Sequence, residues 1–256
     1  MDELLPGEFD ECFLQFKIFF CIVRAMHSNL IVALDVPTLA EAESIVEKLD
    51  DTVNYYKVGN QLFTRVGPAA VEMLRARGKK VFLDLKFHDI PNTVAAAVAS
   101  AAALGVTMVN VHASGGATMM QAAVKSIASA NPRPLLIGVT VLTSLDTATL
   151  NRLGIRRNAA DQVLFLSRVA KRVGLDGVVA SPREIALIRR AYGKEFVIVT
   201  PGVRPSGAAK GDQKRVMTPR MAVSAGANYL VIGRPILAAS NPAETARAIL
   251  AEMRST

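Results

Sequence analysis

Short apolar runs alternate with amphipathic stretches from Met26 to the end of the chain. The runs are nearly continuous, as in Leu30 to Leu34, which is typical of strands covered on both faces of a parallel sheet. The runs predict strands near 29–35, 54–58, 80–86, 107–111, 135–140, 176–180, 196–200 and 228–232. The stretches between them predict helices near 38–49, 66–77, 92–104, 116–129, 159–173, 182–191, 218–225 and 242–253.

Eight strand–helix pairs in about 230 residues are what a closed (β/α)8 barrel, or TIM barrel, requires. A doubly wound open sheet is the alternative, but that fold usually carries a glycine-rich fingerprint after its first strand. The first strand here ends in Asp35-Val-Pro37 instead. We therefore predict one α/β domain, a (β/α)8 barrel over residues 26–256.

Residues 1–25 differ in composition from the rest of the chain. They hold five of the ten phenylalanines and both cysteines, and acidic residues outnumber basic ones. Their apolar part, Phe19 to Val23, is too short for a signal peptide or a membrane span. We predict an N-terminal appendage, with two explanations open. It is either an upstream start that is not the native one or an amphipathic helix that packs on the barrel.

The composition of the chain limits the classes of molecule that it is expected to bind. The chain is 51% hydrophobic without tryptophan, and its formal charge of +8 favours anionic partners. Its basic residues are scattered rather than clustered, which argues against nucleic acid, and no membrane partner is predicted. No cysteine follows Cys21, so the barrel holds neither a disulfide framework nor a cysteine-ligated metal. This fits a cytoplasmic protein.

Charged residues interrupt the third predicted strand. Asp84 and Lys86 stand two residues apart and Asp89 follows three further on. Residues two apart in a strand point to the same face, and burying charge costs several kcal/mol unless it is paired. A structural ion pair would explain one such pair. Alternating charges at adjacent strand ends, with Lys57 on the second strand, favour an active site.

In a barrel, catalysis takes place at the carboxyl ends of the strands. The polar residues that follow the predicted strands there are Asp35, Lys57, Asp84, Lys86, Thr143, Ser144, Arg204 and Arg234. Gly233 and Arg234 follow the eighth strand, where barrels often bind phosphate, although a surface turn would explain the pair as well. The loop 201–218 is long enough to be a functional lid. His88 and His112 lack companions at metal-ligand spacing, so we predict no metal.

The segment Asp84-Leu-Lys-Phe-His-Asp-Ile-Pro-Asn-Thr93 resembles the Asp-x-Lys-x-x-Asp signature of the orotidine 5′-phosphate decarboxylase family in its bacterial form. Six further segments are similar to that family in the same order. They are Leu30–Pro37, Tyr56–Gly59, Val139–Ser144, Thr200–Pro205, Gly211–Arg215 and Val231–Pro235. The likeness runs from about Asn29 to the C-terminus, and residues 1–25 have no counterpart in it.

The resemblance implies cofactor-free decarboxylation of orotidine 5′-phosphate to UMP, in pyrimidine synthesis. It implies that Lys86 protonates C6 of the pyrimidine, that Asp84 lies against the substrate carboxylate, and that Lys57 and Asp89 complete the charged array. Asp35 and Lys57 would hold ribose hydroxyls. The remaining contacts implied, first to the pyrimidine and then to the phosphate and loop, are Thr143, Ser144, Pro201, Arg204, Gln213, Gly233 and Arg234.

The resemblance also implies a homodimer in which Asp89 and Thr93 reach the neighbouring subunit's site. Two rival functions remain. One is a related barrel decarboxylase acting on 3-keto-L-gulonate 6-phosphate, which resembles a Mg²⁺-dependent enzyme with an acidic residue where this chain has Lys57. The other is a non-catalytic barrel that binds RNA or nucleotides, for which binding would depend steeply on salt.

Overall fold

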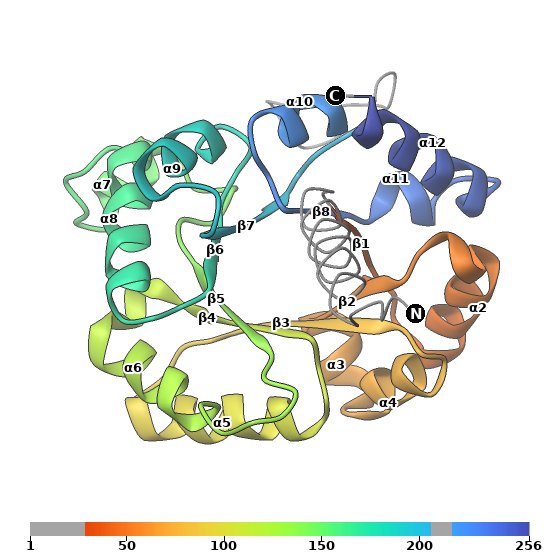
Figure 1. Ribbon diagram of the computed structural model, residues 1–256, viewed down its shortest axis with the longest axis horizontal. Helices are drawn as coiled ribbons and strands as arrows, with labels where there is room; N and C mark the ends of the chain where they lie inside the picture. The colour runs from red at the N-terminus through yellow and green to blue at the C-terminus, as the bar shows by residue number, and fades with distance from the viewer. Residues whose placement is uncertain (1–28, 206–216, 256) are drawn as a thin grey trace, which may run out of the picture.

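The computed structural model describes residues 29–205 and 217–255. Its strands are all parallel and close into a barrel in the order β1 to β8, with β8 paired to β1 (Figure 1). The strands are β1 Asn29–Ala33, β2 Tyr55–Gly59, β3 Lys80–Phe87, β4 Met108–His112, β5 Leu135–Val139, β6 Gly177–Val179, β7 Val197–Pro201 and β8 Tyr229–Ile232. The (β/α)8 barrel is thereby confirmed and the open-sheet alternative excluded, because an open sheet has two edge strands and here every strand pairs on both sides.

The helices lie outside the ring of strands in Figure 1. They are α2 Leu39–Leu49, α3 Asn60–Val66, α4 Ala69–Ala76, α5 Pro91–Ala103, α6 Gly116–Ser126, α7 Thr147–Arg152, α8 Ala159–Arg172, α9 Ile185–Tyr192, α10 Pro219–Ser224, α11 Arg234–Leu237 and α12 Pro242–Arg254. Short 3-10 turns follow α2 at Asp50–Thr52 and β4 at Ala113–Gly115. Several helices begin at the residue types that cap well: Thr38, Asn158 and Asn241 each accept a hydrogen bond from a backbone N–H in the first turn.

Three helical details differ from the sequence prediction. The helix predicted at 66–77 is the second of two, because Gly67 adopts φ 62° and ends α3 one residue before Pro68. Helices α7 and α11 were not predicted. They have six and four residues, which is too short for a hydrophobic period to be recognised.

The strands divide the core into two apolar layers because successive side chains point to opposite faces. One layer lies between the strands and the helices and includes Val32, Leu83 and Val109. The other is a separate cluster contributed by the alternate residues of the strands. It contains Ile31, Ala33, Tyr55, Phe82, Met108, Ile137, Val199 and Val231. This second set faces the barrel axis and fills the barrel interior.

The interior apolar cluster forms the floor of the candidate site. Two residues beyond Tyr55, Phe82 and Met108 along the same strands come Lys57, Asp84 and Asn110. The two-residue period therefore places these three polar residues on the interior face, one layer nearer the carboxyl ends. All three are buried.

Parts of the sequence prediction lie outside the described residues. These are the appendage at 1–25 and most of the 201–218 loop, including Gln213. Within the described ranges, no helix combines the length and the apolar character that crossing a bilayer demands.

Candidate active site

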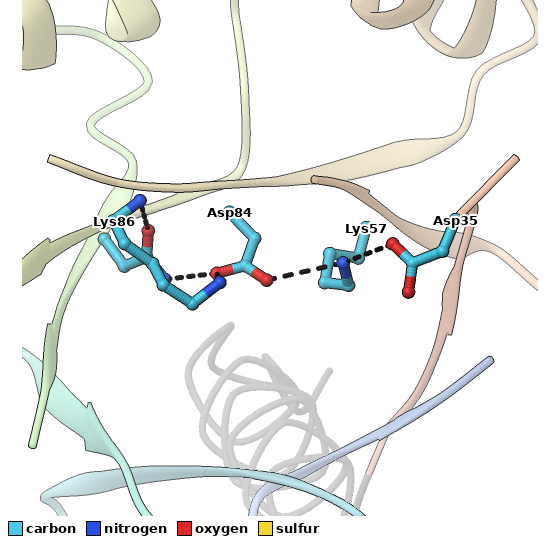
Figure 2. A network of polar contacts seen from close by, with 5 residues as sticks. Asp35, Lys57, Asp84 and Lys86 are labelled. Carbon is cyan, nitrogen blue, oxygen red and sulfur yellow. Dashed lines mark hydrogen bonds and ion pairs between the residues drawn. The ribbon is translucent and has the colours of Figure 1, made fainter. Parts of the chain in front are cut away.

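Four side chains on or just beyond the first three strands form one chain of alternating charges, which we call the ion-pair chain (Figure 2). Lys57 Nζ lies 2.9 Å from Asp35 Oδ1 and 3.4 Å from Asp84 Oδ2. Lys86 Nζ lies 2.8 Å from Asp84 Oδ1. The order Asp35, Lys57, Asp84, Lys86 therefore places each inner charge between two opposite ones. The sequence prediction that these charges gather at adjacent strand ends is confirmed.

Within the ion-pair chain, the two middle side chains are the most buried. The side chains of Lys57 and Asp84 are 10% and 11% exposed, whereas those of Lys86 and Asp35 are 28% and 50% exposed. Charges buried without partners would cost several kcal/mol each. Because two cations alternate with two anions, the charges compensate one another. The more exposed Lys86 ammonium is then available to a ligand at the carboxyl end of the barrel.

Lys86 has an unusual backbone. Its φ is 53°, in a left-handed region that costs a non-glycine residue about 1 kcal/mol or more. The β3–β4 ladder pairs Leu83 with Val109 and next Phe87 with Val111. Three residues of β3 therefore face one residue of β4. The sequence prediction assumed a regular strand, and the structure places a β-bulge there, which re-aims the Lys86 side chain.

Asn110 is the β4 residue opposite the bulge, and the sequence prediction missed it. It is fully buried, its Nδ2 donates to Asp84 Oδ1 at 2.7 Å, and its Oδ1 accepts from the Lys86 backbone N–H at 2.8 Å. One signal could have revealed it. An amide inside the otherwise apolar run Met108 to Val111 must find hydrogen-bond partners when it is buried.

Gly59 is a second residue that the sequence prediction left out of the site. A Cβ at this position would lie 2.6 Å from Lys57 Nζ and 3.3 Å from Asp35 Oδ1. Its φ of −103° suits any residue, so the constraint is the space taken by the ion pair. Glycine here permits the close approach of the Lys57 side chain to the end of its own strand.

Asp89 lies on the segment that joins β3 to α5, Thr93 lies in the first turn of α5, and both are exposed. Asp89 Oδ1 accepts a hydrogen bond from the Ile90 backbone N–H at 2.6 Å, and the Ile90 side chain is 66% exposed. Of the expected charged array, a single subunit therefore brings together Lys57, Asp84 and Lys86. Among the described residues, the ion pairs of that array do not include Asp89.

Thr143, Ser144 and Pro201 line one cavity of about 940 Å³ at the carboxyl end of the barrel. Its described lining comes from the segments after β5, β6 and β7 and from the start of α8. The four charged residues of the ion-pair chain are not among that lining. The cavity and the ion-pair chain thus occupy different parts of the same end of the barrel.

Gly233 places the end of β8 against the end of β1. A Cβ at Gly233 would lie 3.2 Å from Ala33 Cβ and 3.8 Å from Asp35 Oδ2. Arg234 follows and is exposed. Arg204 is only 9% exposed, and its backbone N–H donates to Met217 O at 3.1 Å, which joins the two ends of the 201–218 loop. Gly233 is therefore close to Asp35 at one end of the ion-pair chain, and its role in binding phosphate remains a prediction.

His88 and His112 stack, with ring centroids 5.4 Å apart. Burial lowers the pKa of His112, and the neighbouring His88 and Lys86 lower it further, against the opposing effect of Asp84. A neutral imidazole beside Lys86 adds no charge to the ion-pair chain. Within residues 29–205 and 217–255, no group of three or more His, Cys, Asp or Glu is arranged to hold a metal. The predicted absence of a metal remains a prediction.

A closed barrel with charged residues at the carboxyl ends of its strands defines a (β/α)8 enzyme scaffold. Residues 28–249 match the orotidine 5′-phosphate decarboxylase / HUMPS family, and the chain belongs to this family. A relative from Moorella thermoacetica named orotidine 5′-phosphate decarboxylase is 56% identical over 236 residues, 89% of this chain and 94% of the relative.

Solved structures agree with this assignment. The crystal structure of orotidine 5′-phosphate decarboxylase from Lactobacillus acidophilus superposes with a TM-score of 0.79 at 38% identity, over 90% of this chain and all of that one. The same enzyme from Pyrococcus horikoshii gives a TM-score of 0.71 at 28% identity over 89% of this chain and all of that one. The family resemblance identified from the sequence is thereby confirmed.

Proposed function

We propose that this chain decarboxylates orotidine 5′-phosphate to UMP, a step of pyrimidine synthesis, without a cofactor. Its membership of the family supports the reaction. The observation that carries the mechanism is the contact of Lys86 Nζ with Asp84 at 2.8 Å, inside an ion-pair chain that also includes Lys57. An ammonium held by a carboxylate at the carboxyl end of the barrel can act on an anionic centre there.

The reaction requires that an electron pair be stabilised outside the π system of the ring. When the bond between C6 and the carboxylate breaks, CO₂ leaves and the electron pair stays on C6, in the plane of the pyrimidine. A nearby cation stabilises this charge and can then protonate the carbon. Lys86 performs both roles, and its Nζ proton ends on C6. Solvent then returns a proton to the lysine.

Asp84 acts on the ground state in this proposal. It lies against the substrate carboxylate and repels it, and the repulsion disappears as CO₂ leaves. Binding energy from the distant phosphate holds the reacting end in place. The phosphate contacts are Arg234 and the backbone of Gly233, with Gln213 from the 201–218 loop and Arg204 at its base. Closure of that loop excludes water and strengthens these electrostatic interactions.

The other parts of the substrate contact residues around the same end of the barrel. Asp35 and Lys57 hold ribose hydroxyls. Thr143 and Ser144 meet the pyrimidine edge, and Pro201 lies beside it. The position of Thr143, Ser144 and Pro201 on one cavity supports this assignment. So does the 2.9 Å contact of Asp35 with Lys57, because the pair presents both an acceptor and a donor.

An ultraviolet assay with orotidine 5′-phosphate, with and without EDTA, tests the proposed reaction. We expect turnover that EDTA leaves unchanged, and no CO₂ release from 3-keto-L-gulonate 6-phosphate. Absence of turnover with orotidine 5′-phosphate would contradict the proposal. Turnover that EDTA abolishes and Mg²⁺ restores would contradict the cofactor-free mechanism. CO₂ release from 3-keto-L-gulonate 6-phosphate would favour the metal-dependent rival.

The chain further acts as a homodimer in which Asp89 and Thr93 contribute to the partner's site. The exposure of Asp89 and Thr93 supports this, because both side chains are accessible to a second subunit. A cytoplasmic location agrees with the proposed reaction. It would be tested by fractionation of the native host.

A subunit-mixing experiment decides whose site Asp89 serves. Lys86→Ala and Asp89→Asn homodimers are each expected to be nearly inactive. If Asp89 acts across the interface, mixed dimers contain one fully native site, and remixing restores up to about a quarter of parental activity by subunit statistics. If Asp89 serves its own chain, both sites of every mixed dimer are defective and no activity returns. Light scattering on each sample verifies that dimers are present.

A further inference from the structure

Asn110 occupies a place where an apolar residue would be expected. It lies on β4 in the barrel interior, directly above Met108 of the apolar floor, and it is 0% exposed. A buried amide costs several kcal/mol unless its donor and acceptor both find partners. A leucine, which has the same number of side-chain heavy atoms, would avoid that cost. The presence of an amide at this buried position therefore has to be explained by the groups that it contacts.

Both ends of the Asn110 amide contact the catalytic pair. Its Nδ2 donates to Asp84 Oδ1 at 2.7 Å and its Oδ1 accepts from the Lys86 backbone N–H at 2.8 Å. The reverse orientation would set the amide oxygen against a carboxylate and its N–H against another N–H, so the chemistry of the partners fixes which way the amide points. One neutral side chain thus joins the acid to the lysine backbone.

The β-bulge gives this contact a specific role. Between the Leu83–Val109 and Phe87–Val111 pairs, three β3 residues face Asn110 alone. The Lys86 N–H therefore bonds to a side chain rather than to the β4 backbone. This hydrogen bond holds the lysine at φ 53°, a conformation that surrounding structure must stabilise.

Asp84 is oriented by the same amide. Its Oδ1 accepts from both Asn110 Nδ2 and Lys86 Nζ, while its Oδ2 faces Lys57 at 3.4 Å. Two donors on one oxygen fix the plane of the carboxylate and assign each of its oxygens to one lysine. The position of the Lys86 ammonium consequently depends on Asn110 through both its backbone and its ionic partner.

We infer that Asn110 is a positioning residue that spans the β3 bulge and sets the placement of the Lys86 ammonium relative to Asp84. The inference rests on the proposed function for the role of Lys86. Asn110 reaches the substrate only through these two neighbours. It should therefore affect the chemical step and leave binding of the product UMP unchanged.

The first test replaces Asn110 with leucine, which keeps the number and branching of the side-chain heavy atoms and removes both hydrogen bonds. We expect kcat to fall by about 100-fold, the loss typical of a catalytic group misplaced by about 1 Å, with the Kd of UMP unchanged. Thr200→Val is the matched control, because Thr200 is also a fully buried polar residue of a barrel strand, and its hydroxyl has no hydrogen-bond partner within the described residues. Its kcat should equal the parental value. A parental kcat in Asn110→Leu would overturn the inference.

The second test uses Asn110→Asp, and it separates positioning from simple packing. When ionised, the introduced carboxylate would repel Asp84, so kcat should fall at neutral pH. When protonated, the introduced carboxyl group is a neutral isostere of the amide, whose O–H donates to Asp84 and whose carbonyl accepts from the Lys86 N–H. The ratio of variant to parental kcat should therefore rise as the pH falls. A ratio that does not change with pH would overturn the inference, since a packing defect alone does not titrate.

A crystal structure of Asn110→Leu, or of Asn110→Ser if the leucine variant does not fold, tests the positioning role of Asn110 separately from the proposed reaction. We expect the 2.8 Å contact between Lys86 Nζ and Asp84 Oδ1 to be lost and the Lys86 backbone to leave the left-handed region. An unmoved lysine would overturn the inference whatever the kinetics show. If instead the parent protein does not decarboxylate orotidine 5′-phosphate while the lysine moves as expected, the proposed function fails and the positioning role stands.

Discussion

The two halves of the carboxyl end of the barrel hold their polar side chains differently. On the β1–β4 half, Asp35, Lys57, Asp84 and Lys86 hold one another, with contacts between 2.8 and 3.4 Å. On the β5–β8 half, Thr143 and Ser144 are exposed on the segment after β5 and line a cavity of about 940 Å³. The β1–β4 half thus carries mutually paired charges on or just beyond strands. The β5–β8 half carries mostly polar groups on connecting segments.

This difference matches two separate demands that the proposed cofactor-free decarboxylation makes on the protein. Charges that stabilise a transition state work best when they are already oriented, because reorganising them during the reaction would consume the stabilisation they provide. Strand ends are rigid enough for that purpose. Groups that bind the ring and the phosphate must admit and release a nucleotide, and loops can move as they do so. We propose that the first half performs the chemistry and that the second half binds the nucleotide.

The largest effect should come from Lys86→Ala. Removing both the ammonium and the proton source should lower kcat by at least about 10⁴-fold, from the combined loss of electrostatic and general-acid contributions. Isothermal titration with UMP should show a largely unchanged Kd, because the proposed phosphate contacts lie on the other half. Near-normal decarboxylation by this variant would refute the assignment of Lys86. A lost affinity for UMP would refute the division between the halves.

Arg234→Ala tests the binding half and should have the next largest effect. Losing charge-assisted hydrogen bonds to a phosphate should lower kcat/KM for orotidine 5′-phosphate by about 100-fold. The same substitution should matter little for orotidine, the nucleoside that lacks the phosphate, and that comparison is the control. If kcat/KM for the whole nucleotide stayed at the parental value, the phosphate site would be elsewhere.

Gly59→Ala tests how tightly the charged half is packed. The new Cβ would meet Lys57 Nζ at 2.6 Å, so the lysine ammonium must shift from its position between Asp35 and Asp84. Because the φ of −103° suits alanine and the displaced atom ends a flexible side chain, the melting temperature should change little. We expect kcat/KM to fall by about tenfold, the cost of one weakened charged contact. Unchanged kinetics would show that Lys57 tolerates displacement and that the charged half is less rigid than proposed.

The smallest expected effect concerns pH and His112. Its pKa lies below the ordinary 6.5, first because of burial and then because of His88 and Lys86. The unfolded chain therefore binds a proton more readily, so the contribution of His112 to the free energy of unfolding is complete above pH 6.5 and is lost as the pH falls below it. Urea unfolding of the parent and of His112→Gln between about pH 7.5 and 5.5 measures this. Equal pH dependence in both proteins would show that His112 does not contribute.

The fold could be read from the sequence to a large extent. Parallel barrel strands are covered on both faces, so their apolar runs are nearly unbroken, and β1 to β8 all fall within about two residues of the predicted ranges. The prediction was weakest where hydrophobic periodicity has too few residues to act, at α7 and α11. It also missed the break between α3 and α4, where Gly67 ends one helix before Pro68.

The sequence by itself also determined the charged residues of the candidate site, because strand ends meet at one end of a closed barrel and the motif order specified which ends carry charge. Only the tertiary structure showed that Lys86 sits on a bulge with φ 53° and that Asn110 connects it to Asp84. Those features depend on the register between β3 and β4. Register is a relation between two strands, and the local pattern of either strand alone does not contain it.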